Sequence, residues 1–346
     1  MWGSRRSAAS GLVLAIVLLA GAPAHAQPRT LADQCALETI RPQQRVLACT
    51  ELIGRPGLSA ENLSAAYNNR GISYASLGQA VAALEDYNAA IRTDPTNAAA
   101  YNNRGSALLA VNQVEPALAD LDEAIRLQPR YAAAYNNRGN ARVALGRREA
   151  AMEDYDEAIR INPQYPAALY NRGVLRTATG NAAGAVADFD AALALSPRNL
   201  QVIVGRAAAQ LALGRRDKAL EDYEAANEID ARNIFVLNAL CWNRAVLGNH
   251  SLALRECEAA LRLQPGDPDL LDSRAYAYFR AGRLDDAMRD YQAVLAANPR
   301  AALSLWGRGA VRARQGDRTG AEADFAAARA INSGIEAEAA AIGLRP

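Results

Sequence analysis

Apolar and small residues recur at helical spacing along most of the chain. In residues 64–97, Tyr67, Gly71 and Tyr74 fall on one face of a helix. Ala83, Tyr87 and Ala90 form a matching face on a second helix. The pattern therefore predicts two consecutive amphipathic helices.

A short break separates the two predicted helices. Leu77-Gly78-Gln79 interrupts the pattern, and Pro95 is expected to end the second helix because proline cannot donate the helical hydrogen bond. One such hairpin cannot bury both of its faces. We therefore expect successive hairpins to stack on one another.

The same pattern returns every 34 residues. Ala-Tyr-Asn-Asn-Arg-Gly occurs at 66–71, 100–105 and 134–139, and Tyr170-Asn171-Arg172-Gly173 follows in register. A period of this length is typical of repeat architectures. An alanine and, four residues later, a larger side chain recur in all eight units; the alanines are Ala83, Ala117, Ala151, Ala185, Ala219, Ala253, Ala287 and Ala321.

These positions resemble the tetratricopeptide repeat, a helix-turn-helix unit with aromatic, Gly, Ala and Pro residues at characteristic places. Ala231 and Ser333 stand where the closing proline is expected. The resemblance implies an all-α fold, a right-handed superhelical solenoid of antiparallel helix pairs whose first helices line a concave groove. The eight predicted units are 64–97, 98–131, 132–165, 166–199, 200–233, 234–267, 268–301 and 302–335.

The ends of the repeat array depart from the pattern, as terminal repeats do when one side has no neighbour. Residues 27–63 are predicted to form an N-terminal capping helical hairpin, and residues 336–346 a C-terminal capping helix and tail. Ser333 and Glu336 have the spacing of a capping box, which would start that last helix.

Residues 1–26 have the order of a secretory signal peptide: Arg5 and Arg6, an apolar run, then Ala24-His25-Ala26. A transmembrane helix is the competing interpretation, but the run is shorter than the roughly 20 residues that span a bilayer. We therefore expect an exported protein, in the bacterial periplasm, with no membrane insertion after cleavage. The formal net charge of +1 excludes the basic excess typical of nucleic-acid binding.

Four cysteines remain after the predicted cleavage, and an even number in an exported chain favours disulfides. Cys241 takes the slot of a repeat glycine and Cys257 that of a repeat aromatic, and these two slots face each other. Cys49 lies in register with Cys257, and Cys35 precedes it by 14 residues. We expect Cys35–Cys49 and Cys241–Cys257 disulfides, with four buried free thiols as the alternative.

Asparagines occupy one groove slot in the first four units: Asn69, Asn103, Asn137 and Asn171. An asparagine side chain both donates and accepts hydrogen bonds, so this ladder could bind the backbone of an extended peptide without reading its sequence. In the alternative, the asparagines hold the backbone of the neighbouring repeat.

The later groove slots are aromatic and charged instead, a combination typical of binding hot spots. The candidate ligand contacts there are Trp242, Tyr276, Phe279, Arg280 and Trp306, with Phe235 at a further groove slot. In the alternative, these rings only pack between repeats.

Arginine recurs in one slot of the first helix and aspartate in one slot of the second, as in Arg70 and Asp86. We consider two interpretations, a ladder of ion pairs along the hairpins and two independently solvated faces. The unit with Leu240 in the first slot has Glu256 in the second.

No catalytic motif accompanies the repeats, and no cofactor or metal site is expected. His250 is predicted to lie exposed in a turn beside Gly248-Asn249. The sequence favours a non-catalytic scaffold, not an enzyme, that binds an extended peptide or a partner protein in its concave groove. The alternative is an assembly component that uses its convex face or its ends, with the groove empty or filled by its own chain.

Overall fold

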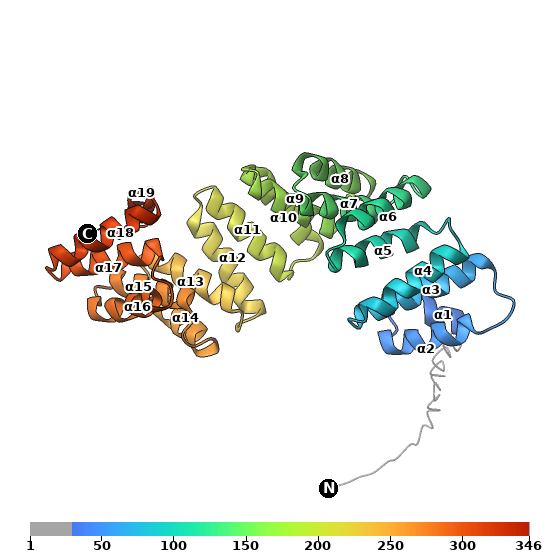
Figure 1. Ribbon diagram of the computed structural model, residues 1–346, viewed down its shortest axis with the longest axis horizontal. Coiled ribbons are helices and arrows are strands. Elements are labelled where there is room, and N and C mark those ends of the chain that lie inside the picture. The colour runs from blue at the N-terminus through green and yellow to red at the C-terminus, as the bar shows by residue number, and fades with distance from the viewer. Residues whose placement is uncertain (1–29, 346) are drawn as a thin grey trace, which may run out of the picture. The chain divides into compact units, whose positions relative to one another are not determined.

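The computed structural model describes residues 30–345, and every regular element in this range is an α-helix (Figure 1). The predicted signal peptide lies outside the described residues. The helices follow one another in antiparallel pairs, so the all-helical solenoid class is confirmed. The chain divides inside one helix into two compact units, with the boundary between Ala107 and Leu108.

The first unit begins with a short hairpin and continues into a longer one. Thr30 caps the first helix through a capping box with Asp33. Helix α3 packs against both α2 and α4. The helices are α1 (Leu31–Ala36), α2 (Pro42–Ile53), α3 (Ala60–Ser76), α4 (Ala80–Thr93) and α5 (Ala98–Ala110), which contains the division.

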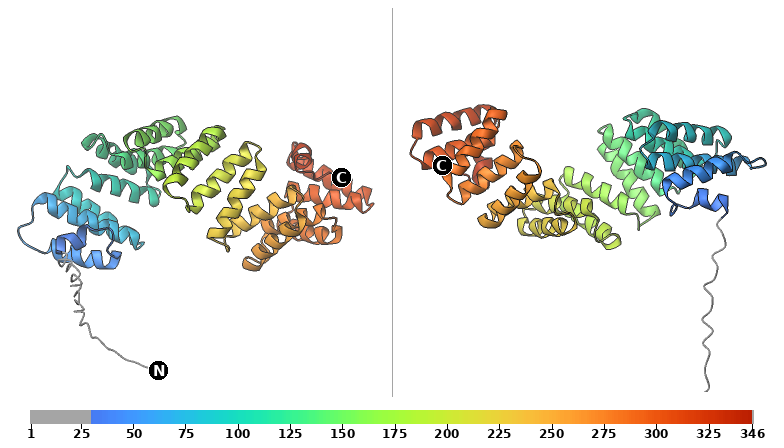
Figure 2. Two further views of the ribbon diagram at one scale, coloured as in Figure 1. Left: turned by 180° about the vertical axis from the view of Figure 1, so that it is seen from behind. Right: turned by 90° about the horizontal axis from the view of Figure 1, so that it is seen from below.

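The second unit holds the remaining pairs, each of which packs against the next (Figure 2). Its helices are α6 (Val114–Leu127), α7 (Ala132–Ala144), α8 (Arg148–Ile161), α9 (Pro166–Ala178), α10 (Ala182–Leu195), α11 (Leu200–Ala212), α12 (Arg216–Ile229), α13 (Ile234–Val246), α14 (His250–Leu263), α15 (Pro268–Arg280), α16 (Leu284–Ala297), α17 (Ala302–Arg314), α18 (Arg318–Ile331) and α19 (Ile335–Ala341).

The turn inside each hairpin needs a left-handed residue. Gly180 has φ of +85° there, and Asn112, the non-glycine residue in the same slot, has φ of +60°. Glycine takes this conformation at little cost, and asparagine tolerates it better than most residues. The break that the sequence predicts at this slot is therefore a left-handed turn.

Close approach within a hairpin depends on pairing a glycine with a large ring. A Cβ atom built on Gly139 would lie 2.5 Å from Cε1 of Tyr155, and one on Gly71 would lie 2.6 Å from Cε1 of Tyr87. Ala151, the small residue of the second helix, is fully buried. The ring of one helix thus fills the space that the glycine of the other leaves.

The second helix of a unit also ends in place where the closing proline is missing. Helix α12 has Ala231 at the proline slot, yet it ends at Ile229 like its counterparts. The Asp230 side chain accepts a hydrogen bond from the Arg232 N–H at 3.0 Å, and Asp94 does the same for Thr96 in α4. This Asx turn offers the backbone an alternative to a further helical turn, so α12 ends at the expected place although its closing proline is missing.

The last helix starts differently from the prediction. Helix α19 has Gly334 as its N-cap residue and no side-chain cap, so the capping box of Ser333 and Glu336 is not formed. The Asn332 side chain accepts the Gly334 N–H at 2.9 Å instead. This local turn moves the helix start one residue beyond the position that the capping box requires.

Candidate functional site

The groove asparagines bind one another between successive first helices. In the first unit, Asn103 Nδ2 donates to Asn68 Oδ1 at 2.9 Å. In the second unit, Asn171 Nδ2 donates to Asn136 Oδ1, also at 2.9 Å. The asparagines therefore do hold the neighbouring repeat, but through its side-chain amide, whereas the alternative interpretation named its backbone. Asn69 is half-buried beside them.

A second series of amide contacts sits beside this one. Asn136 Nδ2 donates to Asn137 Oδ1 at 3.3 Å, and Asn102 Nδ2 donates to Asn103 Oδ1 at 3.1 Å. Asn102 and Asn136 are buried, whereas Asn103, Asn137 and Asn171 are partly exposed. The predicted ladder is thus a network with a buried inner row and a partly exposed outer row.

An open hollow of about 410 Å³ lies between α7 and α9, next to this network. Val143 and Val174 border it with 41% and 44% of their surface exposed. Tyr170 and Asn171 belong to the same lining. The hollow thus combines two solvent-exposed aliphatic side chains with an amide, a composition typical of a small ligand or peptide site.

A polar group at the edge of the hollow has a fixed direction. The Tyr155 hydroxyl donates to Asn140 Oδ1 at 2.8 Å. Burial is the main cause that raises the pKa of Tyr155, so its hydroxyl stays protonated and keeps donating. This bond leaves the Asn140 amide group, Nδ2, as a donor at the rim of the hollow.

The aromatic end of the predicted groove is covered. Tyr276, Phe279 and Trp306 are almost completely buried, and Trp242 packs on Tyr276 with ring centroids 4.6 Å apart. Arg314 lies over the Phe279 ring at 4.0 Å. Instead of the open aromatic surface expected from the sequence, the structure has a hydrophobic cluster.

The chain's own C-terminal residues provide that cover. Arg280 Nη1 donates to the Ile342 carbonyl oxygen at 2.9 Å, and the Tyr276 hydroxyl donates to the same oxygen. Trp306 Nε1 donates to the Leu344 carbonyl oxygen at 3.1 Å. Three of the five predicted contacts at this end therefore bind main-chain carbonyls of the tail.

Phe235 is the exception among the groove aromatics, because 61% of its surface is exposed. Its ring lies 6.5 Å from the Tyr223 ring, measured between centroids. Among the described residues, the other large apolar side chains that are exposed to solvent are aliphatic.

Asp272 is partly buried, and its carboxyl group lies beside the covered cluster. The Ser304 hydroxyl donates to its Oδ1. Burial raises the pKa of Asp272 to about 6, and this effect outweighs the opposing effect of the Ser304 hydrogen bond. The group therefore titrates much closer to neutral pH than an exposed aspartate.

The repeated arginines and aspartates form the ion-pair ladder. Within the units, the closest nitrogen to oxygen distances are 2.6 to 2.7 Å, and the aspartates are buried. Glu256, in the unit that lacks the first arginine, binds Arg244 at 2.6 Å. The pairs are Arg70–Asp86, Arg138–Asp154, Arg172–Asp188, Arg206–Asp222, Arg274–Asp290 and Arg308–Asp324.

Several of these arginines also join successive repeats. Arg172 Nη1 lies 2.7 Å from Asp156 of the preceding second helix, in addition to its own partner Asp188. Arg206 reaches Asp190 in the same way at 2.6 Å. Each of these two guanidinium groups thus binds two carboxylates. Arginine is better suited to this geometry than lysine because its planar group carries several donors in fixed directions.

His250 is not an exposed turn residue, and that prediction is corrected. It is the first residue of α14, it is half-buried, and its Nδ1 has no hydrogen-bond partner in the described part of the chain. Burial, followed by the charge of Arg280, lowers the pKa of His250. No group of three potential metal ligands occurs between residues 30 and 345.

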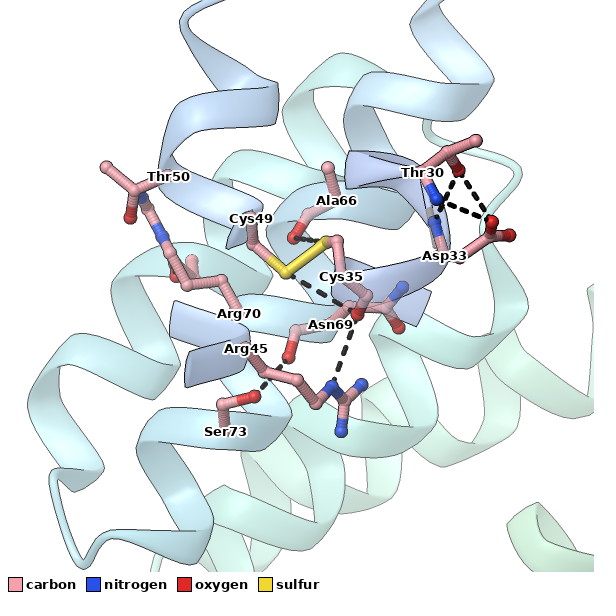
Figure 3. Close-up of a disulfide and its surroundings, with 11 residues drawn as sticks. Thr30, Asp33, Cys35, Arg45, Cys49, Thr50, Ala66, Asn69, Arg70 and Ser73 are labelled. Atoms are coloured by element: carbon pink, nitrogen blue, oxygen red, sulfur yellow. Dashed lines mark hydrogen bonds and ion pairs between the residues drawn. A yellow bond between two sulfur atoms is a disulfide. The ribbon is translucent and has the colours of Figure 1, made fainter. Parts of the chain in front are cut away.

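Both cysteine pairs form disulfides. Figure 3 shows Cys35 and Cys49 bonded, with Arg45 Nε donating to the Cys35 carbonyl oxygen at 3.2 Å. Cys241 and Cys257 join α13 to α14 with their Cα atoms 5.2 Å apart. Each bond connects the two helices of one hairpin.

None of the described helices has the length and apolar character needed to cross a bilayer.

Family comparison identifies the repeat in two stretches of the chain. A family model described as "TPR repeat" matches residues 71–112, 105–146 and 139–180. A second, described as "Tetratricopeptide repeat", matches residues 273–334. No curated protein matches the chain.

Solved structures share the fold at low sequence identity. A tetratricopeptide repeat protein from Parabacteroides merdae is 19% identical, covers 79% of this chain and 99% of its own, and has a TM-score of 0.50. PilF of Pseudomonas aeruginosa is 20% identical over 65% of this chain and all of its own, with a TM-score of 0.57. PilW, described as a type IV pilus biogenesis factor, is 20% identical over 60% of this chain and 96% of its own, with a TM-score of 0.56. These likenesses concern the fold alone.

Proposed function

The chain belongs to the tetratricopeptide-repeat family, and on that premise we propose that it binds an extended segment of a partner protein in the hollow between α7 and α9. Tetratricopeptide repeats are non-catalytic scaffolds for protein interactions. The proposal adds the place of binding and the chemistry of the bound segment.

The hollow of about 410 Å³ beside Val143 and Val174 carries the proposal. Its volume suits one large apolar side chain. Asn171 uses its Nδ2 to bind Asn136, so its Oδ1 can accept an N–H from a peptide backbone. Asn140 can donate to a backbone carbonyl through Nδ2. The ligand would therefore be an extended peptide with one apolar residue. Its neighbouring backbone N–H and carbonyl groups would form hydrogen bonds with the two asparagines.

Selection from a random peptide library on the mature protein tests this proposal. We expect enriched peptides to share an apolar residue. Calorimetric titration should then show that Val174→Asp weakens binding of a selected peptide by roughly tenfold or more, since a carboxylate would face the buried apolar side chain. Val143→Asp should have the same effect.

Val81→Asp is the matched control, because Val81 is 73% exposed and lies on α4 in the other unit. It should leave the affinity unchanged. The proposed site would be refuted if Val81→Asp and Val174→Asp weakened peptide binding equally. It would also be refuted if neither Val143→Asp nor Val174→Asp changed the affinity for the selected peptides. Valine variants are preferable to asparagine variants here because loss of Asn171 would also break the contact to Asn136.

The covered aromatic cluster favours a second candidate function for the C-terminal repeats. Because the tail fills the slots of Tyr276 and Trp306, these repeats could act through their convex face or their end as part of an assembly. Replacing the exposed Leu252 of α14 by aspartate would then disrupt partner capture, whereas Val174→Asp would not. The opposite result would leave the groove as the binding surface.

We further propose that the protein is exported and works in an oxidising compartment, with the bacterial periplasm as the expected location. The signal-like residues 1–26 and the two disulfides support this location. N-terminal sequencing of protein purified from an expressing bacterium should begin at Gln27. A chain that still begins at Met1 would contradict export by this signal.

A further inference from the structure

The chain turns back on itself directly after α19. Gly343 has φ of +74°, and the Leu344 N–H donates to the Ala339 carbonyl oxygen at 2.9 Å. This is the hydrogen-bond pattern with which a glycine commonly ends a helix. The turn brings the carbonyls of residues 342 and 344 to the first helices of the last repeats.

Those carbonyls meet three donors from two separate helices. Tyr276 and Arg280 of α15 both donate to the Ile342 oxygen, and Trp306 of α17 donates to the Leu344 oxygen. The Leu344 side chain is 1% exposed and belongs to the same hydrophobic cluster as Trp306. The tail is therefore bound as a ligand would be, by backbone hydrogen bonds and one buried apolar side chain.

The three donors are departures from the repeat. The slot of Arg280 holds serine at 76, alanine at 110, 144, 178 and 212, valine at 246 and a second arginine at 314, and the slot of Trp306 holds asparagine in four earlier units. Packing of successive repeats does not require a guanidinium or an indole there, since the earlier units form without them. These side chains match the tail and not the general architecture.

We propose that the face of α15 and α17 bearing Tyr276, Arg280 and Trp306 is a second peptide site, and that residues 342–345 are its intramolecular occupant. A separate peptide that binds this site would have the same chemistry as the tail. It would contain an apolar residue, a glycine and a leucine, and the carbonyl groups of the apolar residue and of the leucine would accept the hydrogen bonds. This site is separate from the hollow between α7 and α9, so either proposal can fail without the other.

Space next to the occupied site is consistent with a longer ligand. A hollow of about 400 Å³ borders Trp306 on the side of Phe325 and Arg329. Glu336 at the start of α19 also lines it. A peptide that displaces the tail could extend along this hollow beyond the residues that the tail itself fills.

The test uses the mature chain ending at Ala341 and the peptide acetyl-Ala-Ile-Gly-Leu-Arg-Pro, which copies residues 341–346. We expect the shortened chain to bind a fluorescent form of this peptide. The full-length chain should bind it at least about tenfold more weakly, because its own tail occupies the site most of the time. A peptide with aspartate in place of leucine is the matched control and should not bind.

A second variant keeps the test decisive if the shortened chain does not fold. Full-length Leu344→Asp retains α19 and should expose the site, so it should bind the peptide, and adding Arg280→Ala should abolish that binding. The proposal is overturned if the folded variants bind no peptide, if the full-length chain binds equally well, or if neither variant folds. A full-length chain that dimerises with rising concentration would place the tail on a second copy and would overturn intramolecular occupancy.

Discussion

At the scale of single residues, the fold depends on glycines that leave room for rings. We expect Gly139→Ala to lower stability by roughly 1–3 kcal/mol, because the new Cβ would lie 2.5 Å from the Tyr155 ring and force a buried side chain to move. Thermal unfolding followed by circular dichroism measures the effect.

Gly54→Ala is the control for that substitution. The nearest atom to a Cβ there lies 3.6 Å away, and Gly54 has ordinary helical dihedral angles. Its melting temperature should stay within about 1–2 °C of the parent, since exposed substitutions without a clash change little. Equal destabilisation by both variants would show that the contact with the ring is not the cause.

Asp272 makes stability depend on pH. Its pKa of about 6 in the folded protein exceeds the value near 4 of an unfolded aspartate, so the stability it contributes is complete below about pH 4 and is lost as pH rises through 6. Asp272→Asn cannot lose a proton. The variant should therefore gain stability relative to the parent, by roughly 2 kcal/mol, between pH 4 and pH 7.5.

Melting curves at several pH values test this prediction, with Asp217→Asn as control because Asp217 is exposed and lies on another helix, α12. The difference between Asp272→Asn and the parent should grow with pH, whereas the control should show no such trend. A constant difference from pH 4 to pH 7.5 would contradict the raised pKa.

The sequence predicts some of these residue roles and misses others. The match of small and large residues follows from the repeat, because Gly139 and Tyr155 recur in register. The Asx turn at Asp230 was missed because the proline at other units seemed a sufficient reason for the helix end. The sequence does not predict the hollow beside Val174 either. The exposure of this side chain depends on the size of its neighbours across the groove, and the repeat period gives no information about that size.

At the scale of the element, most hairpins contain an ion pair whose burial costs desolvation. Burial is the largest influence on the pKa of Asp154 and raises it, even though Arg138 acts in the opposite direction. Such pairs stabilise little compared with apolar residues of the same size, but breaking one leaves a buried charge without a partner. We therefore expect loss of one partner to cost more stability than loss of the whole pair.

Arg274 offers the cleanest test because Asp290 pairs with it and with no second arginine in the described residues. Arg274→Leu should cost roughly 2–4 kcal/mol, since it leaves the buried carboxylate unpaired. Adding Asp290→Leu should recover much of that loss. Chemical denaturation of the single and double variants measures both effects.

Arg160→Leu provides the comparison, because the Arg160–Glu157 pair lies on the surface with the arginine two-thirds exposed. Its loss should cost less than about 1 kcal/mol. If the double variant at 274 and 290 is as unstable as the sum of its single variants, the pair does not act as a coupled unit.

At the scale of the whole molecule, the sequence predicts the chain of hairpins better than it predicts which surfaces are open. Repeats and disulfides join residues that are close in sequence, so a 34-residue period reveals them. The tail contact joins Tyr276 to Ile342 across 66 residues and follows no period. Local patterns therefore placed Tyr276 and Trp306 in an open groove, while the structure covers them.

Site-specific photocrosslinking at Val174 tests the central claim, that the groove of α7 and α9 binds a partner segment, most directly. A photoreactive phenylalanine at this position in cells that export the protein should capture one partner segment, and the same residue at Val81 should capture none. Mass spectrometry should place the crosslink in an extended, apolar stretch, and Val143→Asp should abolish it. No adduct at Val174, or equal adducts at both positions, would contradict the account.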